Sequence, residues 1–187
     1  KALKLAAPVP FLDAVQSSLL QFFPVPGLGP GAPSTSVKRS GPEGLRVDVL
    51  APGSALGAIK AVPELAWHAQ TVPFFDYLLE SPIAGAVLAG GHCVPVNLPQ
   101  PARFVWHKLY SSTQRHSDIA KARKDLQQAT VLAAALAESD EEALAEAAAR
   151  APRGLLQAAK ARLLQAKDVL RAHPAAAAAL EQVLGRG

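Results

Sequence analysis

The chain has 187 residues, half of them hydrophobic and 18% charged, with a formal net charge of +4 at pH 7. This length suits one domain with a small annex, and the mild positive charge permits an anionic substrate without the Lys/Arg run of a nucleic-acid-binding arm. Cys93 is the only cysteine, which excludes an internal disulfide and a cysteine-rich zinc site and favours a reducing cytoplasm. No run of about 18 apolar residues occurs, so neither a membrane span nor a membrane partner is expected.

The first part of the chain alternates short apolar segments with Gly/Pro-rich turns. Residues Phe11 to Phe23 have the apolar spacing of a short amphipathic helix. The segments Ser34–Arg39 and Leu45–Leu50 are predicted to be strands, paired as a hairpin across Gly41-Pro42-Glu43-Gly44. A Gly- and Ala-rich loop is predicted over Pro52–Ala61.

A short helix and a second hairpin are predicted next. The helix covers Val72–Leu79, with Pro73 in its first turn. The apolar runs Ile83–Leu88 and Cys93–Leu98 flank Gly90-Gly91-His92, and this arrangement is typical of two strands joined by a tight turn.

From Ala102 onward the sequence is predicted to be helical. Helices are expected over Ala102–Gln114, from Ser117 to beyond residue 136, over Gly154–His173 and over Pro174–Leu184. The apolar stripe of the second of these helices is expected to face its neighbours, and comprises Ile119, Ala122, Leu126, Ala129, Ala133 and Leu136.

This order of elements predicts an α+β fold. A small, mostly antiparallel or mixed sheet comes first and an α-helical bundle follows it. We place the sheet domain at residues 1–100 and the helical domain at residues 101–187.

Asp48 is the first candidate for chemistry, because a carboxylate within a β-branched run is disfavoured unless it has a partner or a metal ion. Strand alternation puts Arg46 and Asp48 on one face, and Val47 and Val49 on the other. Asp48 is therefore either a metal ligand or a strand residue paired with Arg46 or Lys38.

Lys108 and Asp125 are the other two candidates. Lys108 borders the apolar side of its helix, where it either lays its aliphatic stem along apolar surface or binds a phosphate. Asp125 follows Lys121 by four residues, a spacing that suits an ordinary ion pair on a helix surface. The alternative is that Arg115, Lys121 and Lys124 gather cations near this acid, which is a suitable setting for a triphosphate.

Several other kinds of site are excluded by spacing. No two histidines stand four apart on one helix, so a histidine zinc site is not expected. The Gly-Gly-His turn lacks the Lys-Ser/Thr of a phosphate-binding loop, and no nucleophile elbow is present.

Taken in order, a series of segments resembles a bacterial nucleotidyltransferase family of the polymerase-β superfamily, related to the toxin-type abortive-infection nucleotidyltransferases. The resemblance covers about Phe22 to Leu136. It rests on Pro24-Val25-Pro26-Gly27-Leu28, Pro33-Ser34-Thr35-Ser36, Arg46-Val47-Asp48-Val49-Leu50, Phe74-Phe75-Asp76-Tyr77-Leu78-Leu79, Val94-Pro95-Val96-Asn97-Leu98-Pro99, Ala102-Arg103-Phe104-Val105-Trp106-His107-Lys108-Leu109 and Lys121-Ala122-Arg123-Lys124-Asp125-Leu126.

The resemblance implies a cytoplasmic enzyme that uses Mg²⁺ or Mn²⁺ to move a nucleoside monophosphate from an NTP to an RNA or protein acceptor, with an antitoxin as a further partner. Asp48 resembles the third metal-binding carboxylate of such families, and Lys108 and Asp125 resemble the lysine and acid near the nucleotide. Substrate-binding roles are implied for Ser34, Ser36, Lys38, Arg115, Lys121 and Lys124.

One part of the family pattern is missing. The Gly-Ser turn and the Asp-x-Asp pair that supply the other two carboxylates do not occur before Asp48, and we expect them upstream of Lys1. The chain also has no methionine, position 1 included, which is typical of a piece of a longer product. The alternative interpretation is a catalytically degenerate module of this fold that binds a protein or RNA partner.

Overall fold

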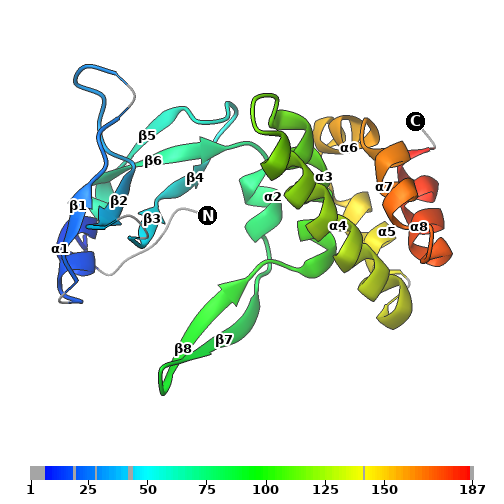
Figure 1. Ribbon diagram of the computed structural model, residues 1–187, viewed down its shortest axis with the longest axis horizontal. Coiled ribbons are helices and arrows are strands. Elements are labelled where there is room, and N and C mark those ends of the chain that lie inside the picture. The colour runs from blue at the N-terminus through cyan, green and yellow to red at the C-terminus, as the bar shows by residue number, and fades with distance from the viewer. Residues whose placement is uncertain (1–6, 19, 28, 42–43, 141, 186–187) are drawn as a thin grey trace. The chain divides into compact units, whose positions relative to one another are not determined.

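The computed structural model describes residues 7–18, 20–27, 29–41, 44–140 and 142–185 (Figure 1). The chain divides into two compact units, Lys1–Asp76 and Tyr77–Gly187, which are described separately below. The expected α+β class is confirmed, because small sheets come first and helices follow. Within the described ranges, no helix is long and apolar enough to cross a membrane.

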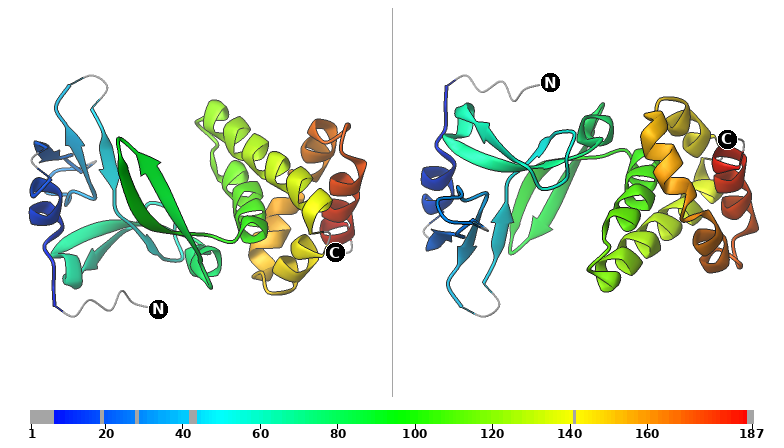
Figure 2. Two further views of the ribbon diagram at one scale, coloured as in Figure 1. Left: turned by 90° about the horizontal axis from the view of Figure 1, so that it is seen from below. Right: turned by 90° about the horizontal axis from the view of Figure 1, so that it is seen from above.

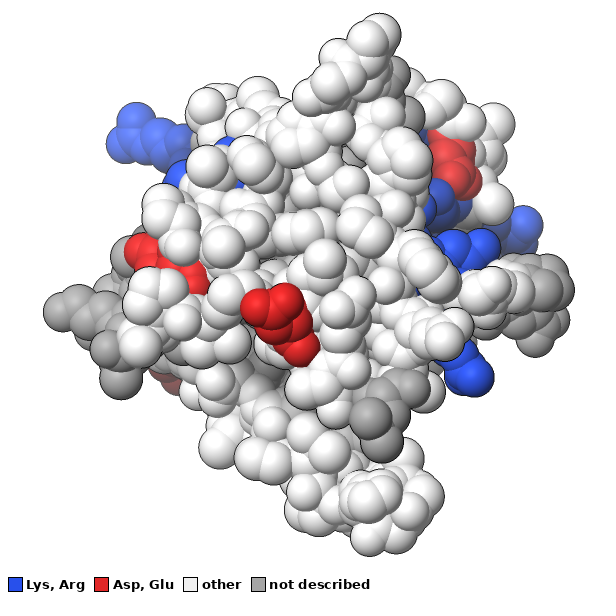
Figure 3. All heavy atoms as spheres, turned by 90° about the vertical axis from the view of Figure 1, so that its left-hand side faces the viewer, with Lys and Arg blue, Asp and Glu red and all other residues white. Residues whose placement is uncertain are grey.

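The first unit begins with helix α1 (Phe11–Gln16) and an antiparallel sheet. Its strands β1 (Phe22–Pro24), β2 (Ser36–Arg39) and β3 (Arg46–Asp48) lie in that order, so β3 is an edge strand. The predicted pairing of β2 with β3 is confirmed, although Pro42 and Glu43 of the expected turn lie outside the described residues. Figure 3 views the side that carries α1 and β1, where most of the visible surface is white and only a few Lys, Arg, Asp and Glu side chains are seen.

The helix predicted up to Phe23 was wrong beyond Gln16. The hydroxyls of Ser17 and Ser18 donate to the carbonyls of Ala14 and Val15, and such side-chain bonds compete with helix continuation. Phe22 then pairs with β2 and is only 5% exposed, so burial in the sheet outweighs the local helical pattern.

A second sheet completes the first unit. Its strands are β4 (Leu50–Pro52), β6 (Trp67–Val72) and β5 (Ile59–Val62), with β4 parallel and β5 antiparallel to the central β6. A 3₁₀ turn, η1 (Pro63–Leu65), joins β5 to β6. The loop predicted over Pro52–Ala61 was therefore too long, because its last residues form β5.

Val49 alone separates β3 from β4, and it connects the two sheets. Its amide donates to the Thr35 carbonyl at 2.9 Å, and its carbonyl accepts from the Gln70 amide at 2.9 Å. Asp48 therefore sits directly beside a residue that is hydrogen-bonded into both sheets.

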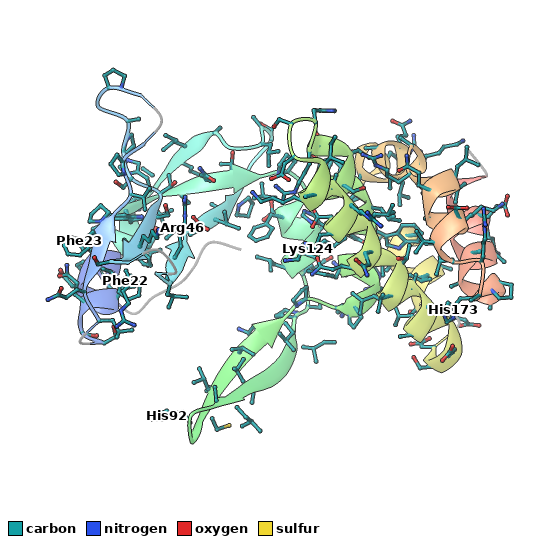
Figure 4. All side chains as sticks on the ribbon, in the orientation of Figure 1. Phe22, Phe23, Arg46, His92, Lys124 and His173 are labelled. Atoms are coloured by element: carbon teal, nitrogen blue, oxygen red, sulfur yellow. The ribbon has the colours of Figure 1, made fainter. Side chains whose placement is uncertain are left out.

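The second unit begins with the end of α2 (Phe75–Leu79) and the second predicted hairpin, which is confirmed. Strands β7 (Ile83–Ala89) and β8 (His92–Leu98) pair antiparallel along their whole length, with His92 at the tip (Figure 4). Gly90 and Gly91 both have positive φ, 56° and 78°, as a two-residue turn matched to strand twist requires.

Six helices follow the hairpin among the described residues. They are α3 (Pro101–Gln114), α4 (Ile119–Ser139), α5 (Ala143–Ala149), α6 (Arg153–Lys160), α7 (Leu163–Val169) and α8 (Pro174–Leu184). Helices α3 and α4 lie side by side in both views of Figure 2. The single helix predicted over Gly154–His173 is divided into α6 and α7.

The helical unit has its own core. Trp106 on α3 is fully buried, and its indole Nε1 donates to the Leu144 carbonyl of α5 at 3.0 Å. Leu109, Leu155 and Leu180 are also completely buried, so α3, α6 and α8 all contribute to the same unit's interior.

The expected apolar stripe of α4 was wrong over the first turns. Ala129 and Ala133 are fully buried, but Ile119 is 80% exposed. Asp125 is buried instead of its neighbour Leu126, which is half-buried. A charged residue in this position needs partners, and α3 and the loop after it supply them.

Candidate functional site

Asp125 is the centre of a small charged group between α3 and α4. The residue is 4% exposed, and its carboxylate accepts a hydrogen bond from Lys108 Nζ at 2.7 Å and another from Arg115 Nε at 2.8 Å. Each carboxylate oxygen has one cationic donor, which is strong charge-assisted geometry. Two cations and one anion leave the Lys108–Asp125–Arg115 group with a net positive charge.

The ionisation of Asp125 is stabilised by its partners. Burial disfavours the charged carboxylate, but the hydrogen bonds from Arg115 and Lys108, with their positive charges, outweigh that effect. The pKa of Asp125 therefore lies below its ordinary value, and the residue is a permanent anion at neutral pH.

A lowered pKa in the folded state predicts how stability changes with pH. The carboxylate stabilises the fold fully above its unfolded pKa of about 3.9, and this contribution is lost as pH falls through the lower folded pKa. We expect the difference in unfolding free energy between wild type and Asp125→Asn to be constant from pH 6 to 8 and to shrink below about pH 4. Urea unfolding at pH 7, 5 and 3 measures it, and a difference that grows towards low pH would contradict the assignment.

Lys108 is oriented by this carboxylate. Its ammonium also lies 5.1 Å from the centre of the Phe104 ring, and its side chain is 20% exposed. Asp125 takes one of the three ammonium donors, which leaves donors for an anion arriving from solvent. The mostly covered Lys108 side chain fits the interpretation that its aliphatic stem lies along apolar surface. Its ammonium, which has donors left over, still suits the other interpretation, in which Lys108 binds a phosphate.

The predicted pair between Lys121 and Asp125 was wrong. Lys121 Nζ lies 3.1 Å from Asp118, whose carboxylate also accepts from the Lys121 amide at 2.9 Å and so caps α4. Asp125 points towards α3 instead, because Lys108 and Arg115 hold it there. Lys124, the other expected substrate-binding cation, is exposed on α4 (Figure 4).

Asp48 lies in the first unit, on edge strand β3. Its carboxylate accepts from Arg46 Nε at 2.8 Å, and both side chains are about half exposed, at 49% and 50%. Arg46, labelled in Figure 4, also donates through Nη2 to Ser36 Oγ at 2.9 Å, and Ser36 lies across from Asp48 on β2. The predicted pairing with Arg46, rather than with Lys38, is therefore confirmed.

The remaining expected substrate-binding residues of this unit lie on or before β2. Ser36 is buried and held by Arg46, Ser34 is half-buried, and Lys38 is exposed. Asp48 and Ser36 are thus brought together by strand register. That Asp48 converges with Lys108 and Asp125 in one cleft stays a prediction, since the three residues belong to two units.

The donor set for a metal ion is incomplete in the described part of the chain. No group of three or more His, Cys, Asp or Glu side chains there is arranged to hold a metal. Asp48 offers one carboxylate, which is already bonded to a guanidinium. Divalent cations such as Mg²⁺ need several oxygen ligands, so these residues alone do not fit the group.

Weak metal binding by this chain is therefore expected. One carboxylate leaves most ligand positions to water, which predicts a dissociation constant for Mg²⁺ or Mn²⁺ of about a millimolar or weaker. Calorimetric titration measures it, with Asp48→Asn as the comparison that should weaken binding further. A micromolar constant would show that further ligands were overlooked.

Two functional candidates were not identified from the sequence. Arg123 and Arg162 line a pocket beside Arg115. A signal for them did exist: neither has an acidic residue three or four positions away, whereas Lys121 and Arg171 each follow an aspartate by three.

The comparisons with known proteins concern the family of the chain. The searches of curated proteins and of solved structures return no match. The sequence profile of a nucleotidyltransferase family, however, matches residues 2–152, which include Asp48, Lys108 and Asp125. Because this match covers most of the chain, the protein belongs to this nucleotidyltransferase family.

Proposed function

We propose that the protein transfers a nucleoside monophosphate from an NTP to an RNA or protein acceptor with the help of Mg²⁺ or Mn²⁺. The observation that carries the proposal is the Lys108–Asp125 contact, because a buried carboxylate holds a lysine ammonium in place with donors to spare. Family membership supplies the reaction type. Asp48 would be one metal ligand, and the other carboxylates would come from outside the described residues.

The proposed chemistry assigns a role to each residue of the charged group. An acceptor hydroxyl attacks the α-phosphorus, a new phosphorus–oxygen bond forms, the bond to pyrophosphate breaks, and the hydroxyl proton is released. Lys108 would donate to the phosphate oxygens where negative charge develops, and Arg115 would add its positive charge. Asp125 would be a positioning residue, because its buried carboxylate holds the Lys108 ammonium and both of its oxygens already accept from Lys108 and Arg115.

A second function has a specific observation in its favour. The described residues lack a complete metal site, and Asp48 is bonded to Arg46. A nucleotidyltransferase fold that only binds a protein or RNA partner would have this appearance. In that case Lys108 and Arg115 would bind the partner, and no nucleoside monophosphate would be transferred.

Label transfer separates the two functions. The protein is incubated with Mn²⁺ or Mg²⁺, each α-³²P-labelled NTP, and total RNA or cell protein, and labelled macromolecules are resolved on gels. We expect label in one acceptor class. The complete absence of label with all four nucleotides and both acceptors would favour the binding module.

The lysine variant then tests the proposed site. Lys108→Ala is expected to reduce kcat/KM by about 30- to 1000-fold, since one contact to a developing charge is worth about 2–4 kcal/mol. Lys167→Ala is the matched control, because it removes a lysine of the same unit whose surface pair with Glu181 contributes little. Equal effects of the two substitutions would remove Lys108 from the site.

Two finer inferences belong to the same proposal. The single cysteine supports a cytoplasmic location. The resemblance to toxin-type enzymes of the polymerase-β superfamily supports a bacterial origin and an antitoxin partner, which co-purification from the source cells would reveal.

A further inference from the structure

A pocket of about 690 Å³ lies in the helical unit, between the first turns of α4 and helix α7. Three arginines, Arg115, Arg123 and Arg162, contribute to its lining. Aliphatic side chains, among them Leu126 and Leu164, form much of the rest. A volume of this order is typical of ligand pockets, and apolar walls strengthen the field of the cations beside them.

Arg162 is held rigidly at the wall of this pocket. Its Nη2 donates to the Ser112 carbonyl of α3 at 2.8 Å, and its Nη1 donates to Gln165 Oε1 at 2.8 Å. Its Nε is buried and has no hydrogen-bond partner. Both acceptors are neutral, so a preorganised guanidinium keeps its full positive charge uncompensated.

The pocket has an excess of positive charge. Arg115 shares the carboxylate of Asp125 with Lys108, and the one acid in the lining, Asp168, pairs with Arg171. Neither Arg123 nor Arg162 has a carboxylate partner in the part of the chain that the structure describes. Such a site attracts an anion.

The surrounding sequence strengthens this field. Residues 103–124 contain six Lys and Arg and one acid, and residues 150–171 again contain six and one, so the start of α4 and all of α7 come from the two most basic stretches. A ligand with several phosphates in sequence gains more from such a surface than a single small anion does.

The shape of the lining favours nucleic acid over an acidic peptide. His116 and the arginines offer flat faces on which bases can stack, and guanidinium groups bind phosphates in a bidentate manner. The aliphatic wall can contact a ribose and the face of a base. We propose that this pocket binds the single-stranded end of an RNA, with its phosphates on Arg123 and Arg162.

The proposed function supplies only one part of this inference, that the bound RNA is the acceptor. RNA binding by the pocket does not depend on nucleotidyl transfer. The residues contributed by α7 and its cap, Arg162 to Val169, follow residue 152, where the family match ends. Neither Lys108 nor Asp125 lines the pocket, so the pocket is distinct from the contact between them, although Arg115 borders both.

Fluorescence anisotropy tests the proposal. The probe is a 5′-fluorescein-labelled, single-stranded RNA of eight nucleotides, titrated with the protein in the absence of NTP and divalent metal. Binding at micromolar protein concentration is expected, and it should weaken as salt rises. Arg123→Ala and Arg162→Ala should each weaken binding about tenfold, and each should reduce the salt slope by about 0.7.

Matched controls separate the pocket from general basicity. Arg153→Ala removes an exposed arginine of the same unit outside the pocket and should change affinity by less than about twofold. Leu164→Glu, at a pocket residue that is 82% exposed, should abolish binding without unfolding the protein, whereas Val131→Glu at a 62% exposed position on α4 should not. The Leu164→Glu arm also covers the case in which Arg162→Ala fails to fold.

The contrary results are equally definite. The RNA assignment would be overturned if the probe did not bind at 100 µM protein, or if Arg153→Ala weakened binding as much as the pocket variants. It would also be overturned if poly-glutamate of matched charge competed as well as unlabelled RNA, and that result would indicate an acidic peptide. RNA binding that persists while label transfer is absent would count against the proposed transferase activity alone. Label transfer without RNA binding would count against this pocket alone.

Discussion

If Asp48 is a metal ligand as proposed, Asp48→Asn is expected to reduce nucleotidyl transfer by about a thousandfold or more, because it removes one of the carboxylates on which the proposed metal chemistry depends. The fold should be almost unaffected. The bond from Arg46 to Asp48 is half exposed, and an exposed ion pair contributes only about 0–1 kcal/mol. An asparagine oxygen can still accept from Arg46, so the strand keeps this contact.

The measurement is the initial rate of label transfer together with the melting temperature of each variant. Asp13→Asn is the matched control, since it changes an exposed aspartate of the same unit on α1. Turnover by Asp48→Asn at wild-type rates would remove Asp48 from the catalytic residues. A large drop in melting temperature would instead assign it a structural role.

Asp125→Ala is expected to have the largest effect on stability, with a loss of about 3 kcal/mol of unfolding free energy. The substitution leaves the buried part of Lys108 and the Nε of Arg115 without their acceptor, so two cations remain close together with no anion between them. Alanine is a good helix former, which means that the loss cannot be attributed to the helix itself.

Urea unfolding at pH 7 measures this loss, and a double-mutant cycle with Lys108→Met isolates the pairwise part. Asp118→Ala, at the half-buried N-cap of the same helix, is the control and should cost clearly less. A cost for Asp125→Ala no larger than that of Asp118→Ala would show that the buried group does not stabilise the fold.

The elements with the clearest sequence signals were predicted well. Pro174 in the first turn and an uninterrupted alanine run define α8, and Gly90-Gly91 defines the second hairpin. Strands β5 and β6 were not predicted, because the alternating burial of Trp67–Val72 depends on neighbours that the segment meets only after folding. The splitting of the helix over Gly154–His173 was also missed, since the residues at the break are good helix formers.

The candidate site was predicted in its residues but not in its contacts. Lys108, Arg115 and Asp125 were all named, yet the expected partner of Asp125 was Lys121. Spacing along one helix favoured that pair, and only the packing of α3 on α4 reveals the better donors. Partners on another element are not encoded in any local spacing. For Arg162, spacing shows only that no acid stands nearby, and its contact with the Ser112 carbonyl of α3 appears only in the structure.

The single-residue junction at Val49 has a mechanical consequence for Asp48. A strand end that continues into a flexible loop can swing, but here the next amide and carbonyl are clamped to Thr35 and to Gln70. The Asp48 backbone is therefore tethered to β6 through one peptide unit, so any displacement of β6 would also shift the Asp48 backbone. Substitutions in the centre of β6, such as at the fully buried Ala69, should for this reason alter the behaviour of Asp48 without touching it.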